Sequence, residues 1–140
     1  MGRILAIDYG TKRTGIAVSD PLQIIAGGLE TVPTNTLMQW LKSYIGQEKV
    51  DTIVVGKPTQ MNGRPSESMA YIEPFVGSLK KEFPEIAVEW YDERFTSRMA
   101  QRTIIEAGIS KMKRRDKALV DRVSATIILQ SYMESQLNRL

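Results

Sequence analysis

The chain has 140 residues and a net charge of +3, with ordinary hydrophobic and charged fractions, so we expect one soluble globular domain spanning residues 1–140. It contains neither cysteine nor histidine, which excludes disulfides, Ser-His and Cys-His nucleophile pairs, and zinc sites with the usual ligands. Any acid–base or metal chemistry must rest on Asp, Glu, Lys, Tyr or bound water, and such oxygen ligands suit Mg²⁺ or Mn²⁺.

The apolar segments are too short to imply a membrane protein. None approaches the ~20 residues that a bilayer span requires, and Asp8 interrupts the first apolar run too early for a signal peptide. Together with the absence of cysteine, this predicts a cytoplasmic protein.

The first informative segment is a pair of apolar runs separated by a glycine-containing turn. Residues 3–9 and 14–19 are expected to be strands, and Asp8 stands near the tip of the first one. A carboxylate there is costly unless a cation, a metal or hydrogen bonds compensate it. Asp8 is therefore a candidate metal ligand. The alternative is a turn aspartate whose side chain binds nearby backbone amides.

The rest of the chain alternates between strand and helix patterns. We expect strands at 24–32, 52–56 and 86–91 and helices at about 35–48, 66–83, 96–107 and 116–135. Thr34, Asn35 or Thr36 is expected to cap the first helix, and Pro74 to bend the second or delay its start. The order β-β-β-α-β-α-β-α-α predicts an α/β fold, a mixed five-stranded sheet with helices on both faces.

Further carboxylates are predicted near Asp8. Asp92 and Glu93 end a strand, and because strand side chains alternate between faces, only one of them can point toward Asp8. We choose Glu93 and keep Asp92 as the alternative. Asp121 lies early in the last helix, on the stripe of Ala125, Ile128, Leu129 and Tyr132 that should face the sheet. Asp8, Glu93 and Asp121 could hold a pair of divalent ions that activates water for attack on a phosphodiester.

Positive charge is concentrated in one segment. Residues 94–122 hold nine basic and three acidic residues, a net charge of +6, whereas the remainder holds ten and thirteen, a net charge of −3. This asymmetry favours a polyanionic partner, although most charge runs are simply solvated surface. The candidate nucleic-acid-binding residues are Lys12, Arg13, Arg94, Lys111, Lys113, Arg114 and Arg115.

Four motifs together resemble the YqgF/RuvX family. They are Asp-Tyr-Gly-Thr-Lys-Arg-Thr-Gly at 8–15, Ile-Val-Val-Gly-Lys-Pro at 53–58, Asp-Glu-Arg-Phe-Thr at 92–96, and Asp121 with Ala125. The resemblance spans nearly the whole chain. It implies an RNase H-like fold related to RuvC resolvases, and a bacterial nuclease of pre-16S rRNA 5′ ends or of Holliday junctions. It also implies that Asp8, Glu93 and Asp121 bind the metal.

One departure concerns the second acid. RNase H-like nucleases commonly carry an acid after the first βαβ strand, where this chain has Gly56-Lys57-Pro58. The acid pair comes one strand later, which leaves the second ligand and the number of ions open.

Three classes of function are compatible with the sequence. A metal-dependent nuclease is preferred, with RNA favoured over branched DNA, a ribosomal precursor particle as a possible partner, and a monomer or homodimer as the assembly. A sugar-kinase-like or actin-like ATPase shares the phosphate-binding hairpin but needs two such domains. A non-catalytic RNA-binding assembly factor would keep the acids for structure.

Overall fold

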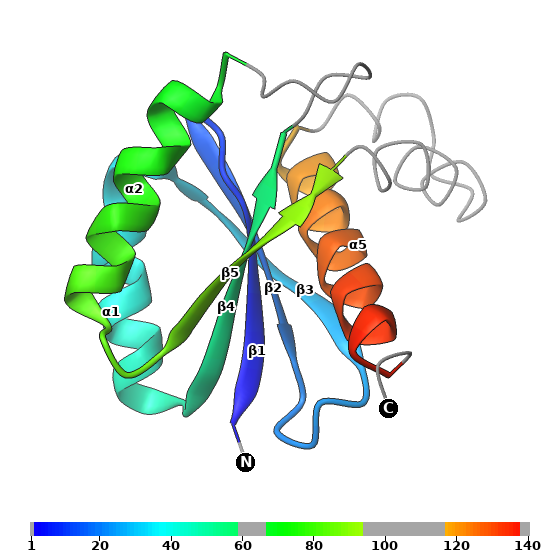
Figure 1. The fold of residues 1–140 in the computed structure, drawn as a ribbon. Coiled ribbons are helices and arrows are strands. Elements are labelled where there is room, and N and C mark those ends of the chain that lie inside the picture. Colours follow the sequence, from blue (N-terminus) through cyan, green and yellow to red (C-terminus); the bar gives the residue numbers. More distant parts are fainter. Residues whose placement is uncertain (1, 59–66, 94–116, 138–140) are drawn as a thin grey trace.

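The computed structural model describes residues 2–58, 67–93 and 117–137, which form a twisted sheet between two helical layers (Figure 1). The strands are β1 (Arg3–Asp8), β2 (Arg13–Ser19), β3 (Ala26–Pro33), β4 (Val50–Lys57) and β5 (Ala87–Asp92). The helices are the 3₁₀ turn η1 (Thr34–Thr36), α1 (Leu37–Gln47), α2 (Met69–Glu82) and α5 (Lys117–Leu137).

The sheet is mixed, as the sequence predicted. Its strand order is β3-β2-β1-β4-β5, in which β1, β2 and β3 are antiparallel neighbours and β1, β4 and β5 run parallel. The middle segments of the central strands, 4–7 in β1 and 53–55 in β4, are apolar and buried, because both faces of these strands are covered. Since β1, β4 and β5 are parallel, their carboxyl ends meet at one edge of the sheet.

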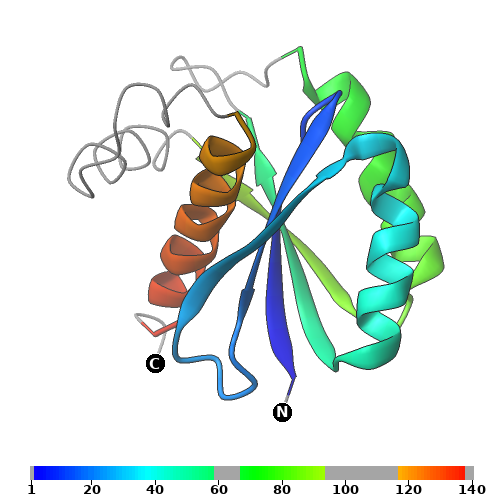
Figure 2. The ribbon, with the colours of Figure 1, turned by 180° about the vertical axis from the view of Figure 1, so that it is seen from behind.

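Strand alternation sorts the core into two layers. Leu5, Ile7, Ile53 and Val55 belong to the cluster with α1 and α2. The alternate positions, including Ile4, Ala6, Ala17 and Val54, belong to the cluster with α5. Figures 1 and 2 show the same division: α1 and α2 cover one face of the sheet, and α5 covers the other.

Helix α5 carries the apolar stripe expected from its sequence. Ala125, Ile128 and Leu129 are no more than 1% exposed, and Tyr132 is 8% exposed. These side chains pack on β1, β2 and β4, so the helix lies with this stripe against the sheet. No helix within the described residues is both long and apolar enough to cross a membrane.

One detail of the helix starts differs from the expectation, the side-chain bonding at the cap of α1. Thr36 is the N-cap of α1, but no side chain caps the helix; the Thr36 hydroxyl instead donates to the Pro33 carbonyl at 2.9 Å. Pro74 lies inside α2, in the second turn, and α2 begins at Met69. The helix predicted at 96–107 lies outside the described residues.

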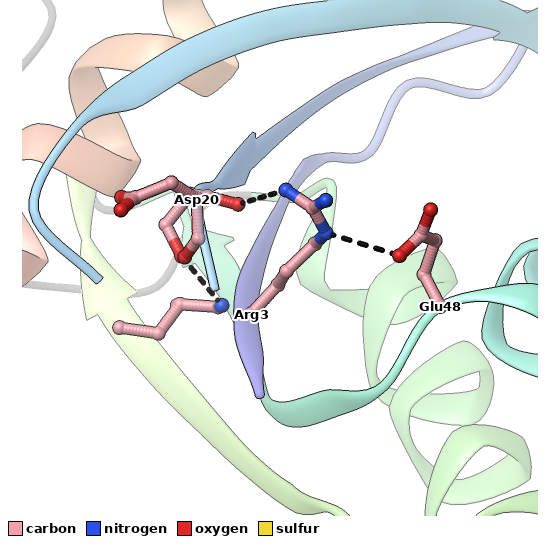
Figure 3. A network of polar contacts seen from close by, with 5 residues as sticks. Arg3, Asp20 and Glu48 are labelled. Carbon is pink, nitrogen blue, oxygen red and sulfur yellow. Dashed lines mark hydrogen bonds and ion pairs between the residues drawn. The ribbon is translucent and has the colours of Figure 1, made fainter. Parts of the chain in front are cut away.

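A polar network closes the edge of the sheet where β1 begins (Figure 3). The Arg3 guanidinium donates to the Ser19 carbonyl at 3.0 Å and pairs with Glu48 at 3.5 Å. The Ser19 hydroxyl accepts a hydrogen bond from the Ile4 amide at 2.9 Å. These contacts join the start of β1 to the end of β2 and to Glu48, the residue that follows α1. The polar groups at this edge of the sheet therefore bind one another.

Candidate metal centre

Asp8 is the last residue of β1, at the opposite edge of the sheet from the Arg3 network. Because it follows Ile4 and Ala6 at alternate positions, its side chain lies on the face covered by α5. Its antiparallel partner on β2 is Gly15. The neighbouring parallel strands end beside it, with Ile7 paired to Val55 and Lys57 paired to Asp92.

The side chains of Asp8 and Glu93 lie within hydrogen-bonding reach of each other. Burial raises the pKa of Asp8 well above its usual value, and the charges of Glu93 and Asp121 raise it further. Burial also raises the pKa of Glu93, to which the Asp92 charge adds. The three acids from β1, α5 and the residue after β5 are therefore close enough to affect one another.

Strand parity explains why Glu93 meets Asp8. Tyr91 packs in the α5 layer, whereas Trp90 packs in the α1 and α2 layer. Glu93 follows the parity of Tyr91, and Asp92 follows that of Trp90. Asp92 is thus placed on the other face, where it acts on Glu93 through its charge.

Gly56 provides the space that Glu93 occupies. A Cβ atom at position 56 would overlap Glu93 Oε1 and would lie 2.7 Å from Ile128 Cδ1. Both distances are shorter than van der Waals contact, so any side chain at position 56 would displace the glutamate. This geometry gives a physical reason for the absence of an acid at the end of β4: the carboxylate of Glu93, from the next strand, fills that place.

Asp121 is brought to the same edge by close packing of α5 on β2. A Cβ atom at Gly15 would overlap the backbone carbonyl of Asp121, so only glycine permits this approach. Gly28 on β3 allows a second close contact, since a Cβ atom there would lie 3.0 Å from Thr126 Oγ1. The glycines thus set how near Asp121 comes to Asp8.

Arg13 forms an ion pair with Asp121. Its Nε donates to Asp121 Oδ2 at 3.2 Å, and the two side chains are 39% and 24% exposed. Lys12, the preceding residue, is exposed at the turn. The other predicted nucleic-acid-binding residues lie outside the described residues: Arg94, Lys111, Lys113, Arg114 and Arg115.

The donor set suits a hard divalent cation. It consists of carboxylate oxygens only, which are the ligands that hard divalent cations prefer. As they stand, no three acidic side chains of the described residues converge closely enough to enclose an ion. Binding would require the carboxylates of Asp8, Glu93 and Asp121 to come closer together.

Sequence reasoning missed the residues that create the space. Gly15 and Gly56 interrupt apolar strands, and a glycine inside a strand is a known indication of close approach by another backbone or side chain. The contact between Arg13 and Asp121 was also missed, because it joins residues that are 108 positions apart.

The mixed five-stranded sheet and its helices define an RNase H-like fold. The solved structure "T. thermophilus RuvC in complex with Holliday junction substrate" matches with a TM-score of 0.61 over 99% of this chain and 97% of that one; at 14% identity this shows the fold. A family model described as "RuvX: Holliday junction resolvase" matches residues 2–135. The chain belongs to the RuvX family.

Curated relatives match along almost their whole length. A protein of Porphyromonas gingivalis named "Putative pre-16S rRNA nuclease" is 65% identical over 96% of this chain and 98% of its own. Proteins of the same name from Bacteroides thetaiotaomicron and Flavobacterium johnsoniae are 61% and 54% identical, each over 97% of this chain and 99% of their own.

Proposed function

We propose that this chain is a divalent-metal-dependent nuclease of the cytoplasm that acts in 5′-end maturation of pre-16S rRNA. The observation that carries the proposal is the placement of Asp8, Glu93 and Asp121 at one sheet edge, where burial raises the pKa of the first two and the charges of Glu93 and Asp121 raise that of Asp8 further. Acids with perturbed pKa values that gather at the ends of strands are candidates for a functional site.

Asp8, Glu93 and Asp121 would hold Mg²⁺ or Mn²⁺, which would activate water and stabilise the leaving oxygen of a phosphodiester. The chain's own residues set the geometry of this site. Because it has no side chain, Gly15 allows the Asp121 backbone to approach β2 closely. Gly56 in the same way leaves the space that the Glu93 carboxylate occupies. Lys12 and Arg13 stand at the border of the acids, where their charges would attract phosphate groups.

RNA is preferred as the substrate because the three relatives compared share the name of a pre-16S rRNA nuclease. A ribosomal precursor would then be the partner particle. The description of the family model and the RuvC-like fold favour branched DNA as the second candidate. Resolution of a junction would be expected to need a homodimer, whereas end maturation needs one site.

The test compares cleavage of a pre-16S rRNA 5′ fragment and of a four-way DNA junction in Mg²⁺, Mn²⁺ and chelator. We expect metal-dependent cleavage of the RNA, and a loss of at least ~100-fold in Asp8→Asn and Asp121→Asn, since each removes a metal ligand. Glu82→Gln is the matched control, because it also turns a carboxylate into an amide but lies on α2, paired with Lys42.

Three results would contradict the proposal. Cleavage of the junction alone would overturn the RNA substrate. Full activity of Asp8→Asn would overturn the site. If both aspartate variants support rRNA maturation while variants of the basic residues at 111–115 abolish it, the protein is a non-catalytic RNA-binding factor.

A further inference from the structure

Arg13 occupies a particular place at the acidic edge. It is the first residue of β2 and has the strand parity of Gly15, so its side chain lies on the face covered by α5. The close approach that Gly15 permits brings Asp121 within reach, and Arg13 Nε donates to Asp121 Oδ2 at 3.2 Å. The contact therefore follows from the same packing that positions the metal ligand.

The three acids are compensated in two different ways. Asp8 and Glu93 lie within hydrogen-bonding reach of each other in the buried part of the site. Asp121, the more outward acid, is held by a guanidinium. A cation that binds all three acids must compete with Arg13 for Asp121, because the two positive groups repel each other and use the same carboxylate.

We propose that Arg13 is an exchangeable counterion of Asp121: it holds this carboxylate before the divalent cation binds, and once displaced it binds a phosphate of the nucleic acid. This inference rests on the proposed function. The Arg13 side chain is 39% exposed, so it can turn toward the substrate without unpacking the core. A guanidinium is well suited to bidentate contact with phosphate.

The first test measures Mn²⁺ binding to the full chain by calorimetry, without nucleic acid. Arg13→Gln removes the competing cation, so we expect its dissociation constant for Mn²⁺ to fall by roughly fivefold, the range of a partly exposed ion pair. Arg13→Lys, which keeps the charge, should bind Mn²⁺ like the wild type. Lys42→Gln removes a lysine paired with Glu82 on the opposite face of the sheet, and should change Mn²⁺ binding by less than about twofold.

The opposite result has a distinct meaning. If Arg13 instead orients Asp121 for the metal, Arg13→Gln will weaken Mn²⁺ binding, by about 10-fold or more. That result, or an unchanged affinity, would overturn the counterion role. If the wild type itself binds no Mn²⁺, or Asp8→Asn binds it equally well, the proposed metal site fails instead.

The second test measures the affinity for a single-stranded RNA oligonucleotide in Ca²⁺, another cation that prefers oxygen ligands, and in chelator. We expect Arg13→Gln to weaken RNA binding by roughly fivefold in Ca²⁺ and by less than about twofold in chelator, where Asp121 still holds the wild-type arginine. An equal loss in both conditions would show that Arg13 is never held back from the phosphate, and would overturn the exchange.

Discussion

At the scale of single residues, the decisive feature is the Asp8 carboxylate, which is desolvated beside two other carboxylates, Glu93 and Asp121. Arg13 pairs with Asp121. Removing a charged group from water costs free energy that only a cation or a proton can offset here. The same grouping of carboxylates that costs this free energy would provide the ligands of the proposed metal.

The pH dependence of stability should report this buried acid. Because the pKa of Asp8 is raised in the fold, the native state binds more protons than the unfolded state above the unfolded pKa of 3.8. The free energy of unfolding without metal should therefore decline as pH rises from that value through the raised pKa. Urea denaturation in chelator between pH 4.5 and 8 measures this slope.

Asp8→Asn should flatten that decline, since the amide does not titrate. At pH 8 it should be at least as stable as the wild type, although it removes a native side chain. Glu82→Gln, whose carboxylate lies in an exposed pair, should keep the wild-type slope. A wild-type slope in Asp8→Asn would show that another group controls the dependence.

At the scale of elements, the site depends on how closely α5 approaches the sheet. Gly15 and Gly28 let the helix backbone lie directly on β2 and β3, and the stripe of buried side chains from Ala125 to Tyr132 fixes its rotation. The helix thus carries Asp121 to the carboxyl end of β1. Core packing and the position of a proposed ligand are set by the same contacts.

Gly15→Ala should separate α5 from β2. The added Cβ overlaps the Asp121 backbone, which cannot rotate away as a side chain can, so we expect a loss of about 1–3 kcal/mol in the free energy of unfolding. Mn²⁺ binding should weaken as well, because Asp121 moves away from Asp8. Urea denaturation and calorimetry measure the two effects.

Gly27→Ala is the matched control. It makes the same change on the neighbouring strand β3, where a Cβ atom would meet nothing within 4 Å. We expect it to change stability by no more than about 0.5 kcal/mol. Equal effects of the two substitutions would mean that close packing at Gly15 is not what holds α5 in place.

At the scale of the whole molecule, the two edges of the sheet are built differently. The edge where β1 begins is joined by hydrogen bonds among Arg3, Ser19 and Glu48 (Figure 3). The opposite edge holds acids that repel one another. A cation bound there would join β1, the end of β5 and α5, which are separated by most of the chain length.

Metal binding should therefore raise the stability of the whole protein. At a free Mn²⁺ concentration of 100 times the dissociation constant, the expected gain is about 2.7 kcal/mol, which chelator should remove. Thermal unfolding followed by circular dichroism measures the shift, and Asp8→Asn should show little of it. An equal shift in Asp8→Asn would place the stabilising ion elsewhere.

Local pattern predicted much of this protein. The apolar runs of β1 and β4 and the stripe on α5 are short-range features, so they predicted the mixed sheet. Strand alternation predicted only that one of Asp92 and Glu93 points toward Asp8. Thr36, one of the three residues expected to cap α1, is its N-cap, but its hydroxyl bonds back to Pro33 instead of capping the helix. The roles of Asp8, Glu93 and Asp121 stay predictions.

The sequence by itself determined the elements, the sheet and the oxygen-only chemistry, because periodicity and composition depend on neighbouring residues. Only the tertiary structure decided the distances. The overlap that excludes a side chain at Gly15 or Gly56, and the pairing of Arg13 with Asp121, join residues far apart in the chain. Such contacts arise when a helix packs on a sheet. A glycine inside a strand indicates that something approaches closely, but not which residue does so.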